Sequence, residues 1–141
     1  MKTAIETLRA SAAVATATTE TGDAIKLQRA YTEMVVTLDV TSAATAVTDL
    51  LDVYIDTSFD GGTSWVNIGL FTQVLGNGGA KKYIMSFKAL PLVASNSVLA
   101  TAEQAESAAL QIGFGDNIRY RGITTEVDTI AFTYSVTAFL K

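Results

Sequence analysis

Cysteine and histidine are both missing from this chain of 141 residues. Without cysteine no disulfide can form, and zinc sites built from cysteine and histidine are excluded. The same absences exclude Ser-His-Asp and Cys-His nucleophilic sites. Histidine is also the side chain whose ordinary pKa lies nearest neutrality, so proton transfer would need shifted carboxylates, lysine or tyrosine. We therefore predict a protein that is not an enzyme, with no catalytic residues, no cofactor and no metal site.

Charge is also scarce, since charged residues make up 17% of the chain and the formal net charge is −4. Nucleic-acid-binding domains usually carry a basic face, so we predict no nucleic-acid partner. No apolar run approaches the roughly 18 residues that a membrane span needs. We therefore expect no membrane partner. Glu6 and Arg9 interrupt any apolar signal core, so we also expect no secretory signal and synthesis in the cytoplasm.

A low charge content allows two interpretations. The chain is either an ordinary soluble β domain, or one that buries much of its outside against copies of itself or against a lattice. The second interpretation follows because the cores of interfaces are depleted in charge relative to exposed surface.

The most informative positive feature is the segment Ser58–Trp65, which lies between two alternating apolar runs. Its Asp-Gly step predicts a β-hairpin, because glycine adopts a positive φ without a Cβ clash. The segment resembles the Asp-box of sialidases, with Ser64 where threonine is usual, and in those families the motif is a hairpin turn remote from catalysis. We expect Asp60 to accept hydrogen bonds from turn amides and Trp65 to pack over the hairpin. The residues given this structural role are Asp60, Gly61, Gly62 and Trp65.

Strict alternation of apolar residues predicts strands elsewhere. The clearest runs are 34–40, 51–55, 83–87 and 130–140, and each turns every second side chain toward a shared core. With residues 65–71 and 117–121 they give six strands separated by turn residues, or seven if the N-terminal segment is also a strand. This profile predicts an all-β, antiparallel β-sandwich of jelly-roll type, folded as one domain over residues 1–141 with at most one short helix. Residues 101–110 fit either that helix or an irregular loop.

The N-terminal segment is ambiguous. Ile5, Leu8 and Ala12 have helical spacing, but the threonine and valine content favours an extended arm or an edge strand, and residues 1–22 are a candidate arm. Its apolar residues have no evident place in the core, so we predict that it contacts neighbouring molecules, for example by strand addition. The candidate interaction residues are Ile5, Leu8 and Val14.

Several acidic and aromatic residues suggest chemistry but fit it poorly. Asp52 and Asp56 share a strand face about 13 Å apart, beyond the roughly 5–10 Å of glycosidase carboxylate pairs. Their spacing also lacks the pattern of a calcium loop. We expect a polar outer face in which exposed carboxylates pair with Arg119 and Arg121. An outward-facing carbohydrate platform would need several aromatic residues to lie together, and the candidates are Tyr54, Trp65, Tyr83, Tyr120 and Phe139.

The pattern as a whole resembles a known class of proteins. The relevant parts are residues 51–65, the Thr72-Gln73-Val74 turn, residues 112–119 and the closing strand 132–136. Over residues 48–140 the chain resembles small structural proteins of tailed-bacteriophage virions, in particular capsid decoration (cement) proteins. The resemblance implies homo-oligomers, often trimers, on the capsid exterior that bridge subunits of the major capsid protein. It carries no catalytic residues to this chain. A carbohydrate-binding module, or a tail or neck component of a phage, is the alternative.

Overall fold

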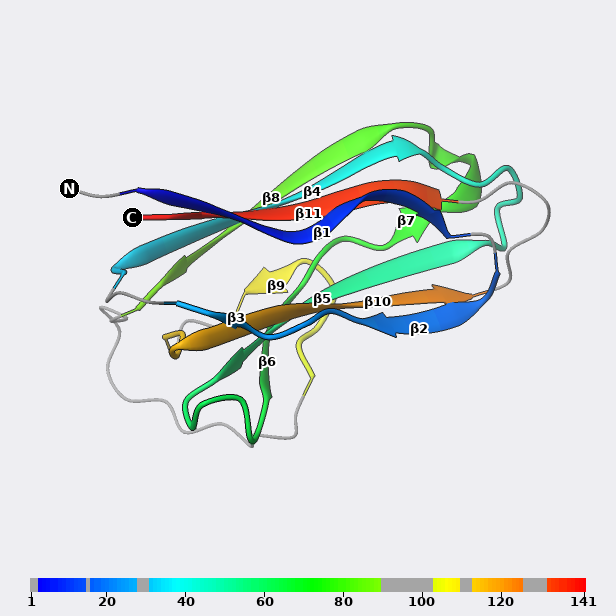
Figure 1. Ribbon diagram of the computed structural model, residues 1–141. Helices are drawn as coiled ribbons and strands as arrows, with labels where there is room; N and C mark the ends of the chain where they lie inside the picture. Colours follow the sequence, from blue (N-terminus) through cyan, green and yellow to red (C-terminus); the bar gives the residue numbers. More distant parts are fainter. Residues whose placement is uncertain (1–2, 15, 28–30, 90–102, 110–112, 126–131) are drawn as a thin grey trace.

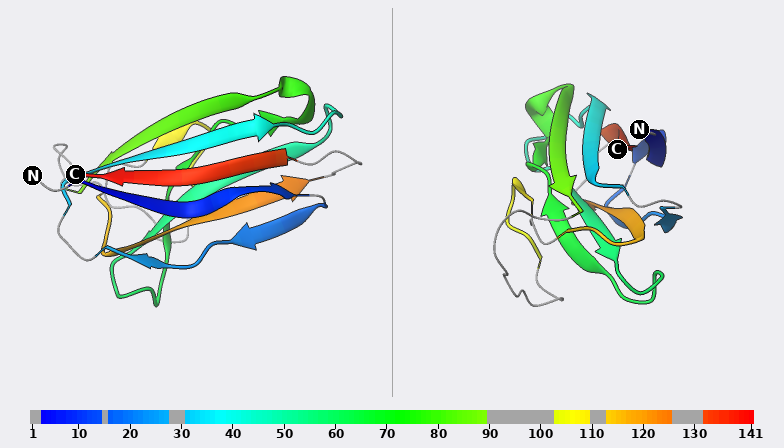
Figure 2. Two further views of the ribbon diagram at one scale, coloured as in Figure 1. Left: turned by 45° about the horizontal axis from the view of Figure 1, so that its top comes forward. Right: turned by 90° about the vertical axis from the view of Figure 1, so that its left-hand side faces the viewer.

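The computed structural model describes residues 3–14, 16–27, 31–89, 103–109, 113–125 and 132–141 (Figure 1). Two antiparallel sheets face each other, and both ends of the chain lie at the same end of the sandwich (Figures 1 and 2). The predicted all-β sandwich is confirmed.

One sheet has four strands, and they lie in the order β1, β11, β4 and β8. Their bounds are Ala4–Val14, Phe132–Leu140, Glu33–Ser42 and Lys81–Lys88, respectively.

The other sheet has seven strands, with the main order β2, β10, β5, β6 and β9. Their bounds are Thr18–Thr21, Asn117–Thr125, Leu50–Ser58, Val66–Leu70 and Ala108–Ala109. The short strand β3 (Ile25–Lys26) pairs with β10, and β7 (Val74–Leu75) pairs with β5. A 3₁₀ turn spans Gly76–Gly78.

The strand order is that of a jelly roll. The antiparallel pairs β1·β11, β2·β10, β4·β8 and β5·β6 are nested inside one another along the chain. The chain is thus one long hairpin wrapped around a barrel-like core. This wrapping places β11 beside β4 in one sheet and β10 beside β5 in the other. Such an arrangement of Greek keys defines the jelly roll.

The apolar core lies between the two sheets. The alternating residues expected to point inward in β4 (Met34, Val36, Leu38, Val40) and β5 (Leu51, Val53, Ile55) are at most 1% exposed. The same is true of the inward residues of β11 from Phe132 to Leu140, while Ile130 lies outside the described residues. In β8, Met85 and Phe87 are buried, and Tyr83 is partly buried at the border of the core. The period-two prediction is therefore confirmed in all four strands.

The N-terminal segment is an edge strand, one of the two extended forms that its composition favoured. Strand β1 pairs with β11, and the register shifts once on each side of Arg9. Because each shift adds a residue to β1, the inward–outward alternation breaks there, and Leu8 and Arg9 are both buried.

The acidic segment near residue 103 forms no helix over its described part. Residues 103–109 consist of loop, a turn and β9, which pairs with β6. The other residues of the expected helix or loop, 101–102 and 110, lie outside the described residues.

Candidate functional site

Asp56 is the centre of a polar network on the outer face of the seven-stranded sheet. Its register partners are Arg119 on β10 and Asn67 on β6, so all three side chains project from the same face. Arg121 reaches Asp56 with two donors, Nε at 2.7 Å from Oδ2 and Nη2 at 3.2 Å from Oδ1. Arg119 Nε donates to Oδ2 at 3.2 Å, and Asn67 Nδ2 donates to Oδ1 at 3.1 Å.

The expected pairing of Asp56 with both arginines is confirmed, but the expected exposure is wrong. Asp56 is only 2% exposed, because the two guanidinium groups and the neighbouring strand enclose it. Burial opposes the charge of Arg121, but hydrogen bonds and attraction from Asp56 and Glu103 outweigh it, so the pKa of Arg121 is raised. A charge-assisted, two-donor pair of this kind is stronger than an exposed ion pair.

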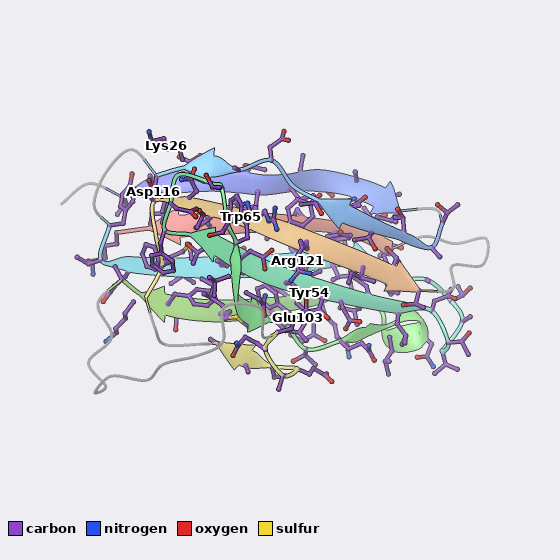
Figure 3. The ribbon with its side chains drawn as sticks, turned by 90° about the horizontal axis from the view of Figure 1, so that it is seen from below. Lys26, Tyr54, Trp65, Glu103, Asp116 and Arg121 are labelled. Atoms are coloured by element: carbon purple, nitrogen blue, oxygen red, sulfur yellow. The ribbon has the colours of Figure 1, made fainter. Side chains whose placement is uncertain are left out.

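Two aromatic rings complete the network. The Arg119 guanidinium lies 4.2 Å from the centre of the Trp65 ring, and that of Arg121 lies 4.6 Å from the Tyr54 ring. Figure 3 shows Trp65, Arg121, Tyr54 and Glu103 following one another along this face. Each arginine therefore contacts a carboxylate and an aromatic face, an arrangement that the planar guanidinium favours.

Residues 103–109 fasten onto the same face. Glu103 Oε1 accepts a hydrogen bond from Arg121 Nη1 at 2.9 Å. The backbone N–H of Gln104 donates to Asn67 Oδ1 at 2.8 Å. Further along the segment, Glu106 Oε1 accepts a hydrogen bond from the backbone N–H of Gln73 at 2.9 Å. Asn67 thus links Asp56 to this segment, because its Nδ2 donates to Asp56 and its Oδ1 accepts from Gln104. Its Nδ2 also donates to backbone oxygens on both sides of the irregular β5–β6 pairing.

The two carboxylates of β5 have separate partners. Asp52 accepts from Gln73 Nε2 at 3.1 and 3.2 Å, whereas Asp56 binds the arginines. Burial raises the pKa of Asp52, against the opposing effect of the Gln73 hydrogen bond. Asp56 and Glu103 together bind three nitrogens of Arg121, and Asp56 accepts from Nε of Arg119. Within the described residues, the network therefore ties β5, β6, β10 and residues 103–104 together on this face.

A second ionic cluster, partly buried, joins the two sheets along one side of the sandwich. Arg9 on β1 is 8% exposed and donates to Glu20 on β2 through Nε at 2.8 Å and Nη2 at 3.2 Å. It also donates to the backbone oxygens of Ala12 and Tyr134, and it lies 3.8 Å from the centre of the Tyr134 ring. The hydrogen bond from Arg9 holds the pKa of Glu20 below its usual range.

Two tyrosine hydroxyls complete this cluster. Tyr134 Oη and Tyr120 Oη donate to Glu20 at 2.9 and 3.3 Å. Burial raises the pKa of both phenols, most strongly that of Tyr134. Glycine at 122 provides the room, because a Cβ there would collide with Tyr134 Oη. From the sequence we interpreted Arg9 only as an interruption of an apolar run. Nothing near it in the sequence indicates that its partner is Glu20, eleven residues later.

The hairpin between β5 and β6 is organised by Asp60. Its carboxylate accepts from Ser64 N at 2.8 Å, from Ser64 Oγ at 2.6 Å and from Ser58 Oγ at 2.7 Å. These bonds, those from Ser64 first, lower the pKa of Asp60 to about 2. Gly61 and Gly62 adopt φ values of +73° and +92°, which disfavour other residues. Trp65 lies beside Gly62 and under Arg119, so the hairpin leads directly into the arginine network.

The three residues predicted to contact neighbours occupy different environments. Leu8 and Val14 are 8% and 4% exposed and belong to the protein's own core, so the reason for assigning them to an interface no longer holds. Ile5 is 66% exposed and remains accessible. The candidate aromatic platform is likewise divided, since Tyr120 is in the core and Phe139 lies on the outer face of the other sheet.

Among the described residues, no three or more acidic side chains are grouped so as to hold a metal ion. That part of the chain also contains no helix long and apolar enough to cross a membrane. Comparison with protein families, with curated proteins and with solved structures gave no match.

Proposed function

We propose that this protein is a non-enzymatic structural component of a tailed-phage virion, most specifically a decoration protein that binds the outside of the head. The observation that supports the proposal is that its central charged side chains bind one another within the fold, while large apolar side chains are exposed. Asp56, Arg9 and Glu20 are directed at partners within the fold, while Ile5, Ile84 and Phe139 are 66%, 68% and 44% exposed. Such a molecule uses its polar chemistry to hold its own shape and offers an apolar surface to other proteins.

The fold and the sequence resemblance support the same proposal. Jelly rolls occur in viral capsid proteins, although the fold is also used by lectins and cupins and does not decide function. The identification of a virion rests on the likeness of residues 48–140 to capsid decoration proteins. The proposed mechanism is mechanical: because the protein binds the assembled lattice and not free subunits, its binding energy stabilises the assembled state.

The direct test is cosedimentation with expanded, undecorated capsids built from the major capsid protein of the same phage. We expect saturable binding with a fixed number of copies per capsid, and a higher capsid melting temperature with the protein bound. Unexpanded procapsids are the control and should bind less. No pelleting with expanded capsids at micromolar protein would contradict the proposed location, and binding to isolated tails instead would assign the protein to the tail or neck.

A carbohydrate-binding module is the second candidate, because Tyr54 and Trp65 lie on one outer face. Against it, each ring already contacts an arginine, which leaves less aromatic surface for a sugar. A glycan array probed with the labelled protein separates the candidates: specific glycan binding that is lost in Trp65→Ala would support the module.

A further inference from the structure

The outer face of the four-stranded sheet carries a continuous uncharged band over its described residues. One row across the sheet holds Ile5, Phe139, Val35 and Ser86, and the next holds Thr7, Thr137, Thr37 and Ile84. A groove of about 360 Å³ runs along part of this face, lined by Ile5, Val35 and Phe139 among others. We call the two rows the apolar band after Ile5, Val35, Ile84 and Phe139; the other four members are threonine or serine.

Charged residues border the apolar band at both ends. Beyond the first row lie Lys141, Glu33 and Lys88, and beyond the second lie Asp39 and Lys82. Within the chain Lys141 pairs with Glu33 at 3.9 Å, and Lys82 pairs with Asp39 at 3.6 Å. Both pairs are about half exposed, so they contribute little to the free energy of folding. Their arrangement makes the face selective for the orientation of a partner.

We propose that the apolar band packs against the same band of a second copy, about a two-fold axis that runs parallel to the strands between β11 and β4. Sheets that pack face to face keep their strands within about 30° of each other, which this axis satisfies. It places Phe139 opposite Val35 of the partner subunit, near the centre. It also places Lys141 opposite Glu33 of the partner subunit, so opposite charges meet twice.

The alternative axis, perpendicular to the strands, is disfavoured by the same charges. It would exchange the two ends of the band and set Glu33 opposite Asp39 of the partner subunit. It would also set Lys88 opposite Lys82 of the partner subunit. Like charges meeting across an interface suppress a wrong arrangement, so the border residues select the parallel axis.

The size of the face sets the expected strength. Four strands about 4.8 Å apart and about six residues long at 3.4 Å each cover roughly 20 Å by 20 Å. Burying it on both copies removes about 800 Å² in total, below the roughly 1,200–2,000 Å² of stable specific interfaces, so we expect a weak, transient dimer with a Kd on the order of 100 μM. The inference does not rest on the proposed function. A weak dimer leaves this face free at low concentration, and it differs from the trimer that the resemblance to decoration proteins implies.

The test uses two charge reversals in the full chain, followed by sedimentation velocity from about 1 to 500 μM. Glu33→Lys and Lys141→Glu should each abolish the dimer, because each homodimer would contain two repulsive contacts. An equimolar mixture of the two variants should regain it, since both contacts between positions 33 and 141 again join opposite charges in the heterodimer. Restoration by mixing cannot arise from an effect within one chain.

Matched controls are Asp23→Lys and Lys26→Glu, which make the same charge changes at exposed positions outside the band. Both should dimerise like the unaltered protein. Ile84→Lys, at a position that is 68% exposed, should give a folded monomer. A monomer at every concentration, a trimer, a dimer that survives Ile84→Lys, or a mixture that stays monomeric would each overturn the proposal.

Discussion

At the scale of single residues, Asp56 shows how a carboxylate in an alternating strand becomes tightly constrained. Its cross-strand neighbours on both sides are polar, and residues 103–109 fasten onto the same network. Its removal would leave two arginines, each about one-fifth exposed, without their shared counter-charge. An unpaired charge that stays largely buried costs more than the pair itself contributes.

We therefore expect Asp56→Asn to lower the free energy of unfolding by about 3 kcal/mol, at the lower end for a broken buried pair. Urea denaturation followed by Trp65 fluorescence measures this change. The matched control is Asp39→Asn, which breaks the half-exposed pair with Lys82 and should cost less than about 1 kcal/mol. Equal effects of the two substitutions would show that the Asp56 network is not the stabilising feature we take it to be.

Asp60 gives a prediction that depends on pH. Its pKa is about 2 in the folded protein and 3.8 in the reference state, so its contribution to stability is complete above about pH 4 and is lost as the pH falls toward 2. Ser64→Ala removes the first cause of the shift and should move the pKa of Asp60 back toward 3.8. Carboxyl carbon NMR measures it directly. Thr63→Ala also removes a hydroxyl from the turn, and it should leave the pKa near 2.

At the scale of elements, the bulged edge strand β1 is the part that alternation alone describes least well. A strict period of two would place Arg9 on the same face as Ile5, but the register shift beside Leu8 turns Arg9 inward. Bulges in edge strands also make them poor templates for pairing with another chain. The apolar content of this segment therefore serves the core at Leu8 and Val14, and the surface at Ile5.

Leu8→Ala should lower the free energy of unfolding by about 2–3 kcal/mol, because it opens a cavity at the edge of the core. Ile5→Ala, in the same strand, should change it by less than about 0.5 kcal/mol, because an exposed side chain loses little burial. Both are measured by denaturation at about 1 μM, where the proposed self-association is weak. A large loss in Ile5→Ala together with a small loss in Leu8→Ala would contradict the placement of β1.

The sequence was sufficient where one short-range rule governs a segment. Alternation predicted the inward faces of β4, β5 and β11, and the Asp-Gly step located the β5–β6 hairpin. It was insufficient where partners are far apart, as for Arg9 with Tyr134 and for Glu103 with Arg121. It also misjudged Asp56, because an outward-facing position in a strand is exposed only if no other part of the molecule covers it.

At the scale of the whole molecule, nesting of the strand pairs makes every pair but the innermost a long-range one. The outermost pair joins Ala4 to Leu140 across nearly the whole chain. Folding must close these long loops before the contacts repay the lost entropy, so we expect refolding in milliseconds to seconds. Stopped-flow dilution from urea, followed by the fluorescence of Trp65, measures this rate. Microsecond refolding would contradict the nested arrangement.

The outermost pair also determines how the molecule responds to force. Ala4 and Leu140 are opposite each other, and their strands run antiparallel from the same end of the sandwich (Figure 2). A force that pulls these two ends apart would load the β1·β11 hydrogen bonds one at a time. The two strands would therefore separate at low force. A load spread over the broad face of a sheet acts on many bonds at once, so the molecule is far better suited to being pressed than to being pulled by its ends.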